Sequence, residues 1–548
     1  MSPPTTYLHL LPVELWIACW TLCSHRQLRR ISLVCQLFRS LCLPLVFQDQ
    51  TFDVAALGRQ LTRNNWMDRV RHLHRTAVRL DRLIESPYAH FVRSWKVTLP
   101  HSSRISPYHP DIQNIHVFDT TYDRVVTTFC RTLEVYQNLS SLYLQRFTID
   151  TAFRTTLISL PRLQTLTLSE CNMVDQHGFL NLGSLTLISP RDLGAPEGPL
   201  QIASPDTLRT LTLNLSSPIA SLVTGFGPKD LPHLIHLTID ALSVAHLDTL
   251  VRFLDKCPRL ESLAINSVSG IHPTSPVPHS NTIPLLHTFA GPPSLIQLFV
   301  PNRPVSRVTV MGAKWKDNST DITVACMAIS HSTRPLHYLA LPCIAPKLDF
   351  LISITHLFPE LQELTAVVEG YIRGHCGGVF GRRPIVTTVD SESLDLCDDD
   401  AFDNPKTDEV SDDEPEEYPT AIPTTGYIPP NLLTSPEMSA FSNSGVREIV
   451  RWIVAGQLTL PPSIEVFQLE AEGSVLGLSL AEQQAAVVVL GTLCPGLCQL
   501  QFGGSSNHWR RDGGLWKGEV QRTGYRRRTI NEDSQKRFMS MAAGATKA

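Results

Sequence analysis

The chain has 548 residues, of which 43% are hydrophobic and 18% charged, a composition typical of folded proteins and a length that allows several core units. Its 13 cysteines are odd in number and scattered, which favours reduced thiols in the cytosol or nucleus over a disulfide framework. The net charge is −4, and no apolar run reaches the roughly 18 residues of a membrane span, so we expect no membrane association.

Residues 11–47 predict three short helices. Pro12 stands where a helix can begin, and Ser24 with Gln27 three residues later forms a capping-box pattern for a second helix. Trp16, Ile17 and Trp20 recur at one-turn spacing. Two apolar faces follow, one with Leu28, Ile31, Cys35 and Phe38 and one with Val34, Leu37 and Leu41. So small a unit cannot bury both faces, so it needs a partner surface or the rest of the chain.

The order of these elements resembles an F-box. The matching residues are Leu11-Pro12, Glu14-Leu15, Ser32-Leu33-Val34-Cys35, Phe38-Arg39 and Pro44-Leu45-Val46-Phe47. Gln36 departs from the family's usual Arg or Lys, and Trp20 from its usual aliphatic residue. The resemblance implies docking on a Skp-type adaptor through Leu11, Pro12, Ile17, Leu28, Ile31, Val34, Cys35 and Phe38. The alternative is an ordinary amphipathic helical cap on a larger domain.

Residues 52–86 read as helical and carry several arginines. Acidic residues Asp68, Asp81 and Glu85 are interleaved with them, and no set of stacking aromatic residues accompanies them. We therefore expect a solvated helix face and no nucleic-acid partner.

A short pattern, Leu-x-x-Leu-x-Leu, then recurs along the chain. The central residues Leu185, Leu211, Leu237, Leu263 and Phe289 are each 26 residues apart. Further windows centre on Trp95, Leu142, Leu166, Leu339, Leu364, Phe467 and Leu500. A fixed period of this length is typical of a leucine-rich-repeat solenoid, in which each strand needs a stacked neighbour to close its core.

The repeats are irregular. Only the window before Cys171 has a residue of the consensus type, Asn or Cys, in its turn. The windows at Leu295–Val300 and Val305–Val310 lie too close together for full repeats, and we expect a local hairpin or insertion there. The predicted fold class is therefore α/β, with an N-terminal three-helix F-box followed by an irregular leucine-rich-repeat solenoid, a horseshoe.

A composition break separates the last windows from the others. Residues 390–417 hold 14 acidic residues and one lysine, a net charge of −13, so the rest of the chain carries +9. Residues 371–436 are predicted to be a disordered insertion, because they have too little apolar surface to fold. Ser411 precedes three acidic residues and is a possible phosphosite; the alternative is a purely solubilising segment.

The residues between the leucines of each strand point to the opposite face. They are rich in hydroxyls and contain no arginine pair, so we expect recognition of an unphosphorylated protein surface. The predicted substrate-binding residues are Tyr143, Thr167, Thr212, His236, Thr238 and Asp240. The alternative is that threonine simply suits exposed strands.

No catalytic residues, metal or cofactor are predicted. Cys19, Cys23 and His25 lie close together in sequence, but no second pair of ligands follows them. A pair such as Cys494 and Cys498 is too small for a zinc site. An enzyme with a site assembled from distant residues stays open as an alternative.

The resemblance implies a non-catalytic substrate-recognition subunit of a Skp–cullin–F-box E3 ubiquitin ligase, with an adaptor, a cullin and an unknown protein substrate as partners. The alternative is a leucine-rich-repeat scaffold that uses the F-box for assembly without ubiquitin transfer. The expected organisation is an F-box at 1–50, a helical linker at 51–90, a solenoid at 91–370, the insertion at 371–436, C-terminal repeats at 437–510 and a cap with a flexible tail at 511–548.

Overall fold

The computed structural model describes residues 12–53, 66–99, 112–173, 178–188, 201–215, 217–227, 229–269, 282–311, 319–368, 445–471, 478–502, 507–512, 514–520 and 528–529. The protein is a mixed α/β protein that divides into two compact units. Unit 1 comprises Met1–Pro342 with Leu357–Leu361, and unit 2 comprises Cys343–His356 with Gln362–Ala548.

Three helices open unit 1: α1 (Val13–Trp20), α2 (His25–Ile31) and α3 (Gln36–Gln48). The capping box is confirmed, because the Ser24 backbone N–H donates to Gln27 Oε1 at 2.8 Å and the Gln27 N–H donates to Ser24 Oγ at 3.4 Å. The last helix runs directly into strand β1 (Asp49–Asp53).

Parallel strands then follow in chain order, each paired with the next. Their bounds are β2 (Ser94–Thr98), β3 (Ser141–Gln145), β5 (Thr165–Ser169), β7 (Ser184–Ile188), β8 (Thr210–Leu215), β9 (His236–Ser243), β10 (Ser262–Ser269), β11 (Thr288–Gly291), β12 (Arg307–Val310) and β13 (Tyr338–Ile344). The central residues of the windows are register partners from strand to strand, and all are buried: Trp95, Leu142, Leu166, Leu185, Leu211, Leu237, Leu263, Phe289, Val308 and Leu339. The strand prediction for these windows is confirmed.

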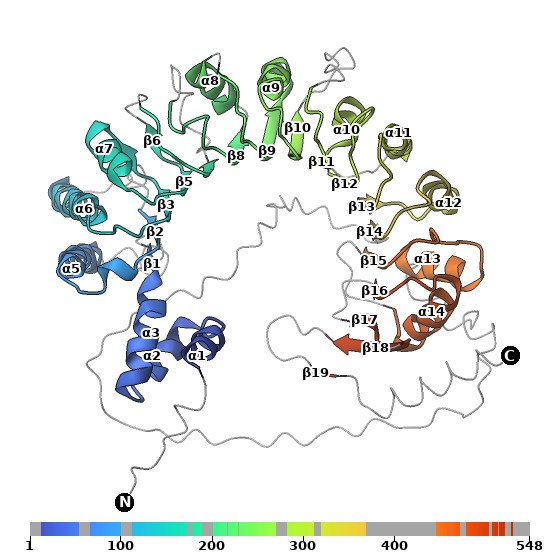
Figure 1. Ribbon diagram of the computed structural model, residues 1–548, viewed down its shortest axis with the longest axis horizontal. Helices are drawn as coiled ribbons and strands as arrows, with labels where there is room; N and C mark the ends of the chain where they lie inside the picture. The colour runs from blue at the N-terminus through green and yellow to red at the C-terminus, as the bar shows by residue number, and fades with distance from the viewer. Residues whose placement is uncertain are drawn as a thin grey trace, which may run out of the picture. The chain divides into compact units, whose positions relative to one another are not determined.

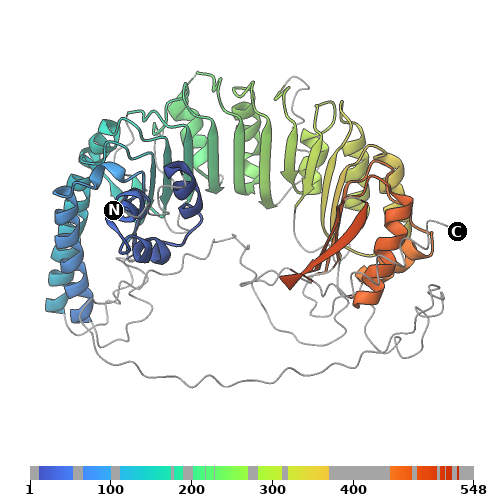
Figure 2. The same cartoon turned by 60° about the horizontal axis from the view of Figure 1, so that its bottom comes forward.

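Helices cover one side of this sheet, and among the described residues of these repeats none lies over the other side, which we call the open face (Figure 1, Figure 2). They are α5 (Trp66–Ile84), α6 (Ile112–Leu133), α7 (Thr151–Ser159), α8 (Ser217–Phe226), α9 (Leu247–Leu254), α10 (Pro293–Phe299) and α11 (Ser319–Ser330), with short 3-10 turns η2 (Ala89–Phe91) and η4 (Val244–His246). A separate small pair joins β4 (Thr148–Ile149) to β6 (Asn172–Met173). The arginines of α5 at positions 71, 75, 79 and 82 are exposed, as expected for a solvated helix face.

Two local predictions were wrong. Residues 295–300 do not form a hairpin strand, because Leu295, Ile296 and Phe299 fall on the buried side of α10, which starts after Pro292. The following window is the ordinary strand β12, paired on both sides. In addition, the sheet begins at β1 and not near residue 91, because β1 pairs with β2 over its full length.

Unit 2 continues the alternation of helices and strands on both sides of the insertion. Its elements are α12 (Leu348–Leu357), β14 (Glu363–Val368), α13 (Gly445–Val454), β15 (Val466–Ala471), α14 (Leu480–Leu493) and β16 (Gln499–Phe502), then β17 (Asn507–Asp512), β18 (Leu515–Val520) and β19 (Arg528–Thr529). β14 pairs directly with β15 in parallel, with Leu364 opposite Phe467, although the insertion separates them in sequence. The predicted disordered segment, including Ser411, lies outside the described residues.

An antiparallel hairpin follows β16, the last parallel strand, and pairs with it. β17 pairs with β16 and β18 pairs with β17, so the direction of the sheet reverses. The Trp509 indole N–H donates to Gln483 Oε1 at 3.0 Å, and both side chains are buried. The hairpin therefore packs on α14 and covers the edge of β16.

Candidate interaction surfaces

The N-terminal helices have a small core of their own. Trp20, Leu28, Cys42 and Val46 are buried together, and Trp16, Ile31 and Phe38 pack against them. The ring of Phe38 lies edge-on to Trp20 with centroids 4.8 Å apart. The two tryptophans that recur at one-turn spacing thus hold α1 against α3.

Several large apolar side chains of the same helices remain exposed. They are Val13, Leu15, Ile17, Leu22, Leu33 and Val34, which we call the exposed apolar set. Leu33 is 84% exposed and Val34 is 69% exposed, in the turn between α2 and α3. A folded protein gains nothing by leaving such side chains in water, so their exposure points to a partner surface.

The predicted adaptor-binding residues divide into two classes. Pro12, Ile17 and Val34 are exposed, whereas Ile31, Cys35 and Phe38 are half-buried. Leu28 must be corrected, because it is only 5% exposed and belongs to the core of the three helices. Leu11 lies outside the described residues.

The set also includes residues that sequence reasoning left out of the predicted site. Leu22 and Leu33 are the most exposed of the set, and each lies just after the C-cap residue of a helix. Both residues lie in turns, where a large apolar side chain has no helix face to join. Cys35, predicted as a contact, instead caps α3: its Sγ accepts from the Phe38 N–H at 3.4 Å.

The open face of the sheet has the predicted polar rows. Burial alternates along β3, β5 and β7, with the leucines buried and the residues between them half-buried. One row is continuous across the strands, in the order Lys96, Tyr143, Thr167, Thr186, Thr212 and Thr238. Since neighbouring strands in a sheet are about 5 Å apart, this row presents evenly spaced hydroxyl-bearing side chains from Tyr143 to Thr238. Tyr143, Thr167, Thr212 and Thr238 are thus brought together.

His236 and Asp240 lie on β9, on the same face but in other rows. His236 is exposed. Asp240 accepts a hydrogen bond from Asn266 Nδ2 at 2.6 Å. Burial raises the pKa of the Asp240 carboxyl above its usual value, and this outweighs the opposing effect of the Asn266 hydrogen bond.

Tyr143 lies near the charged side chains of Lys96, Arg146 and Glu170. The ammonium of Lys96 lies 5.4 Å from the centre of its ring. Arg146 and Glu170, which follow β3 and β5, are both in the left-handed backbone region and pair at 2.8 Å. Burial raises the pKa of the Tyr143 phenol above its usual value.

Cys171 lies in the turn after β5, as its window predicts. Its thiol donates to the carbonyls of Leu144 and Ser169, both at 3.4 Å. Burial raises its pKa to about 11, so it is not a reactive thiolate. Among the residues that the structure describes, no group of three or more His, Cys, Asp or Glu side chains is placed to hold a metal ion. In the same part of the chain, no helix combines the length and the apolar character that crossing a bilayer requires.

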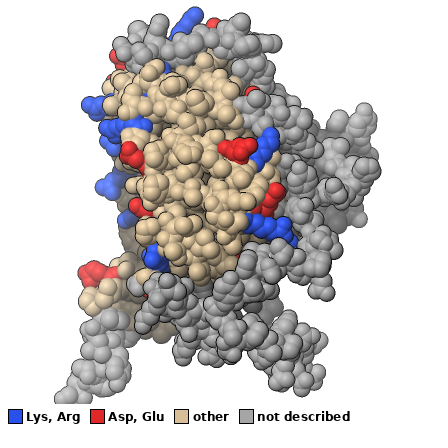
Figure 3. Space-filling model, turned by 90° about the vertical axis from the view of Figure 1, so that its right-hand side faces the viewer, with Lys and Arg blue, Asp and Glu red and all other residues tan. Residues whose placement is uncertain are grey.

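Unit 2 presents an uncharged surface. On the side that carries α12 to α14 in Figure 1, Lys, Arg, Asp and Glu lie mainly at the margins of a broad uncharged area (Figure 3). α14 has one charged residue, Glu482, which is buried, while Leu480 and Leu493 are exposed. Nothing in the described residues indicates what covers this area.

The candidate surfaces are therefore the exposed apolar set of the N-terminal helices and the polar rows of the sheet in unit 1. No protein-family model matches the chain, and no curated protein matches it.

Proposed function

We propose that the protein is a substrate-recognition subunit of a Skp–cullin–F-box E3 ubiquitin ligase, acting in the cytosol or nucleus. The N-terminal helices would be the F-box and would bind a Skp-type adaptor, and the leucine-rich repeats of the sheet would bind the substrate. The protein would perform no chemistry itself. It would raise the effective concentration of a substrate near an activated ubiquitin.

The exposed apolar set carries this proposal. The three helices already bury a core of Trp20, Leu28, Cys42 and Val46, so the exposed side chains are not needed for that core. Leu33 and Val34 lie within the Ser-Leu-Val-Cys motif on which the resemblance rests. A surface that is apolar and separate from the core suits a permanent protein partner better than it suits water.

The sheet supports the second half of the proposal. The side chains on its open face are mostly short and polar, and they are half-buried. The register of β2 to β9 sets the spacing between them. Stacked repeats create extended surfaces of this kind, which bind proteins. The row from Lys96 to Thr238 contains no pair of arginines to bind a phosphate, so the proposed substrate surface is unphosphorylated.

The test is recovery of a Skp-type adaptor and a cullin with the purified chain. Replacing Leu33 and Val34 together by Asp is expected to weaken adaptor binding at least about 100-fold, because each buried side chain contributes about 1.5–3 kcal/mol. Ile158→Asp is the matched control, because Ile158 is 52% exposed on α7. Ile31 is avoided because it packs against the core, where a charge would unfold the helices.

Retention of the adaptor by the Leu33 and Val34 variant would refute the F-box assignment. Recovery of the adaptor without a cullin would instead favour a scaffold that does not transfer ubiquitin. A second variant, with Tyr143, Thr212, His236 and Asp240 replaced together by Ala, is expected to lose substrate in proximity labelling while it keeps the adaptor.

A further inference from the structure

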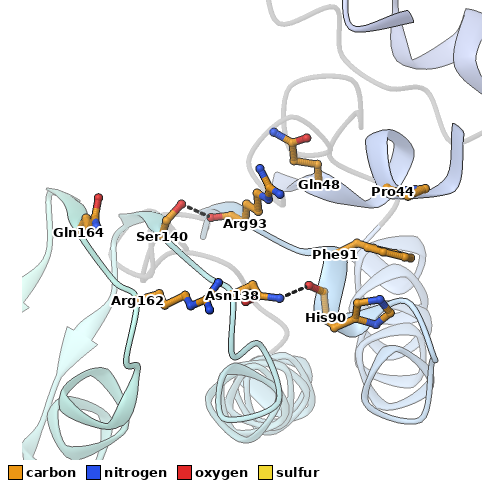
Figure 4. A pocket seen from close by; sticks show the side chains of 9 residues that line it. All are labelled: Pro44, Gln48, His90, Phe91, Arg93, Asn138, Ser140, Arg162 and Gln164. Atoms are coloured by element: carbon orange, nitrogen blue, oxygen red, sulfur yellow. Dashed lines mark hydrogen bonds between the residues drawn. The ribbon is translucent and has the colours of Figure 1, made fainter. Parts of the chain in front are cut away.

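A hollow of about 630 Å³ lies in unit 1 between the end of α3 and the turns that lead into β2, β3 and β5 (Figure 4). We call it the junction hollow. Residues from four separate segments meet there, from Pro44 in α3 to Gln164 before β5. It is distinct from both surfaces used in the proposed function, because its lining includes neither the exposed apolar set nor the row from Lys96 to Thr238.

The backbone fixes the walls of the junction hollow. The Arg93 N–H donates to the Gln48 carbonyl at 2.9 Å. The Arg93 carbonyl in turn accepts from the N–H groups of Ser140 and Ser141, at 2.8 and 3.0 Å, and from Ser140 Oγ at 3.2 Å. The same turn recurs before β5, where the Ser140 carbonyl accepts from the N–H groups of Gln164 and Thr165. Such turns fix the backbone from which the side chains at the hollow extend.

The junction hollow has an excess of positive charge. Its described lining residues include Arg93 and Arg162 but no Asp or Glu. Both arginine side chains are exposed, and among the described residues neither guanidinium has a hydrogen-bond or ion-pair partner. Arg162 extends toward Asn138, whereas Arg93 extends toward Gln48 (Figure 4). Two unpaired guanidinium groups on different walls suit a ligand with two separated anionic groups.

The remaining lining groups distinguish between anionic ligands. Gln48, Asn138 and Gln164 have carboxamides, which both donate and accept hydrogen bonds. Asn138 donates through Nδ2 to the His90 carbonyl at 2.7 Å, so its Oδ1 is oriented as an acceptor. A polyphosphate offers only acceptors to such groups, whereas a peptide backbone offers both N–H and C=O. Phe91 and Pro44 add apolar surface for a chain that lies across the hollow.

We propose that the junction hollow binds an acidic, unphosphorylated peptide segment, with its carboxylates on Arg93 and Arg162 and its backbone on the carboxamides. It would be a second anchor for a client protein, and it rests on the proposed function only in assigning the peptide to a client. Peptide binding itself is independent of any adaptor or cullin.

The experiment measures fluorescence anisotropy of a labelled peptide with alternating Asp and Gly, added to the full chain at low salt. The same peptide with Asn in place of Asp is the comparison. We expect the Asp peptide to bind, the Asn peptide to bind at least about tenfold more weakly, and the difference to shrink at high salt. Because residues 390–417 are themselves acidic, the measurement is repeated with that run replaced by Gly and Ser.

The matched variants are Arg93→Ala with Arg162→Ala, and Arg259→Ala as the control. Arg259 is exposed in Pro258-Arg259-Leu260, the same turn as Pro161-Arg162-Leu163, but it lies outside the hollow. The double variant is expected to lose about tenfold in affinity, since each exposed ion pair is worth up to about 1 kcal/mol. The control is expected to bind the peptide normally, and adaptor recovery should be unchanged in both proteins.

Equal binding of the Asp and Asn peptides, or unchanged binding by the double variant, would overturn the proposal. Inorganic triphosphate provides the other decisive comparison. If it binds more tightly than the Asp peptide through the same two arginines, the site is for phosphorylated compounds and the peptide assignment is wrong. Loss of adaptor recovery by the Leu33 and Val34 variant bears on the proposed function alone, because those residues do not line the hollow.

Discussion

Replacing Glu482 tests how helices α13 and α14, which follow the insertion, pack against each other. Its carboxylate is 5% exposed and pairs with Arg447 of α13, with Arg447 Nε 2.8 Å from Glu482 Oε1 and Nη2 3.4 Å from Oε2. The same carboxylate accepts from the Ser479 N–H at 2.8 Å and from Ser479 Oγ at 2.9 Å, which completes a capping box at the start of α14. One side chain therefore joins two helices and caps one of them.

Glu482→Ala removes both roles. Breaking one side of a buried ion pair costs about 3–5 kcal/mol, and Arg447, whose side chain is only 17% exposed, would lose its bond to this carboxylate. Loss of the capping box adds about 1 kcal/mol. The change is therefore expected to lower the free energy of unfolding of unit 2 by roughly 4–6 kcal/mol.

Urea denaturation followed by hydrogen exchange measures this loss and locates it. Exchange should accelerate in α13, α14 and β15 to β18, while α9 and β9 of unit 1 keep their protection. Glu465→Ala is the control, because Glu465 is exposed in the turn before β15 and should change stability by no more than about 0.5 kcal/mol. If Glu482→Ala behaved like Glu465→Ala, the packing of α13 on α14 described above would be wrong.

Two further predictions concern the sheet. Gly291→Ala should destabilise unit 1 by about 1–3 kcal/mol in urea denaturation, because its new Cβ would lie 2.9 Å from Cζ of the fully buried Phe289. Adding Phe289→Leu should recover part of the loss. If the effects of the two substitutions on the free energy of unfolding simply added, the contact between these residues would be contradicted. Asp240→Asn should stabilise the protein at pH 7, because burial raises the pKa of Asp240 and so disfavours its ionised form. The sign follows from linkage: the folded state holds the proton more tightly, so the native protein loses stability as pH rises above 3.8, the ordinary value for this carboxyl. The advantage of Asn should therefore shrink as pH falls toward 4, and an advantage that is constant with pH would refute the assignment to charge.

The sequence alone determined the strands. Each window alternates leucines with small polar residues, and this local alternation requires one buried and one open face. The windows at Leu166, Leu185, Leu211 and Leu237 therefore became strands with the expected register. The capping box at Ser24 was equally local, because it involves residues three positions apart. In both cases the decisive interactions lie within one element or repeat at a time.

Apolar spacing could not decide which of two apolar faces is buried. Leu28 and Val34 both have aliphatic side chains on predicted apolar faces, yet packing against Trp20 and Cys42 buries only Leu28. For the same reason Leu295–Val300 matched a strand window but packs as a helix, because its burial depends on the repeat beside it.

The tertiary structure alone decided the contacts between distant segments. β14 pairs with β15 across the insertion, and the junction hollow gathers Gln48, Arg93, Asn138 and Arg162 from separate turns. These residues meet because each stacked strand brings its entry turn beside the previous one, and only the packed repeats fix which side chains share that edge.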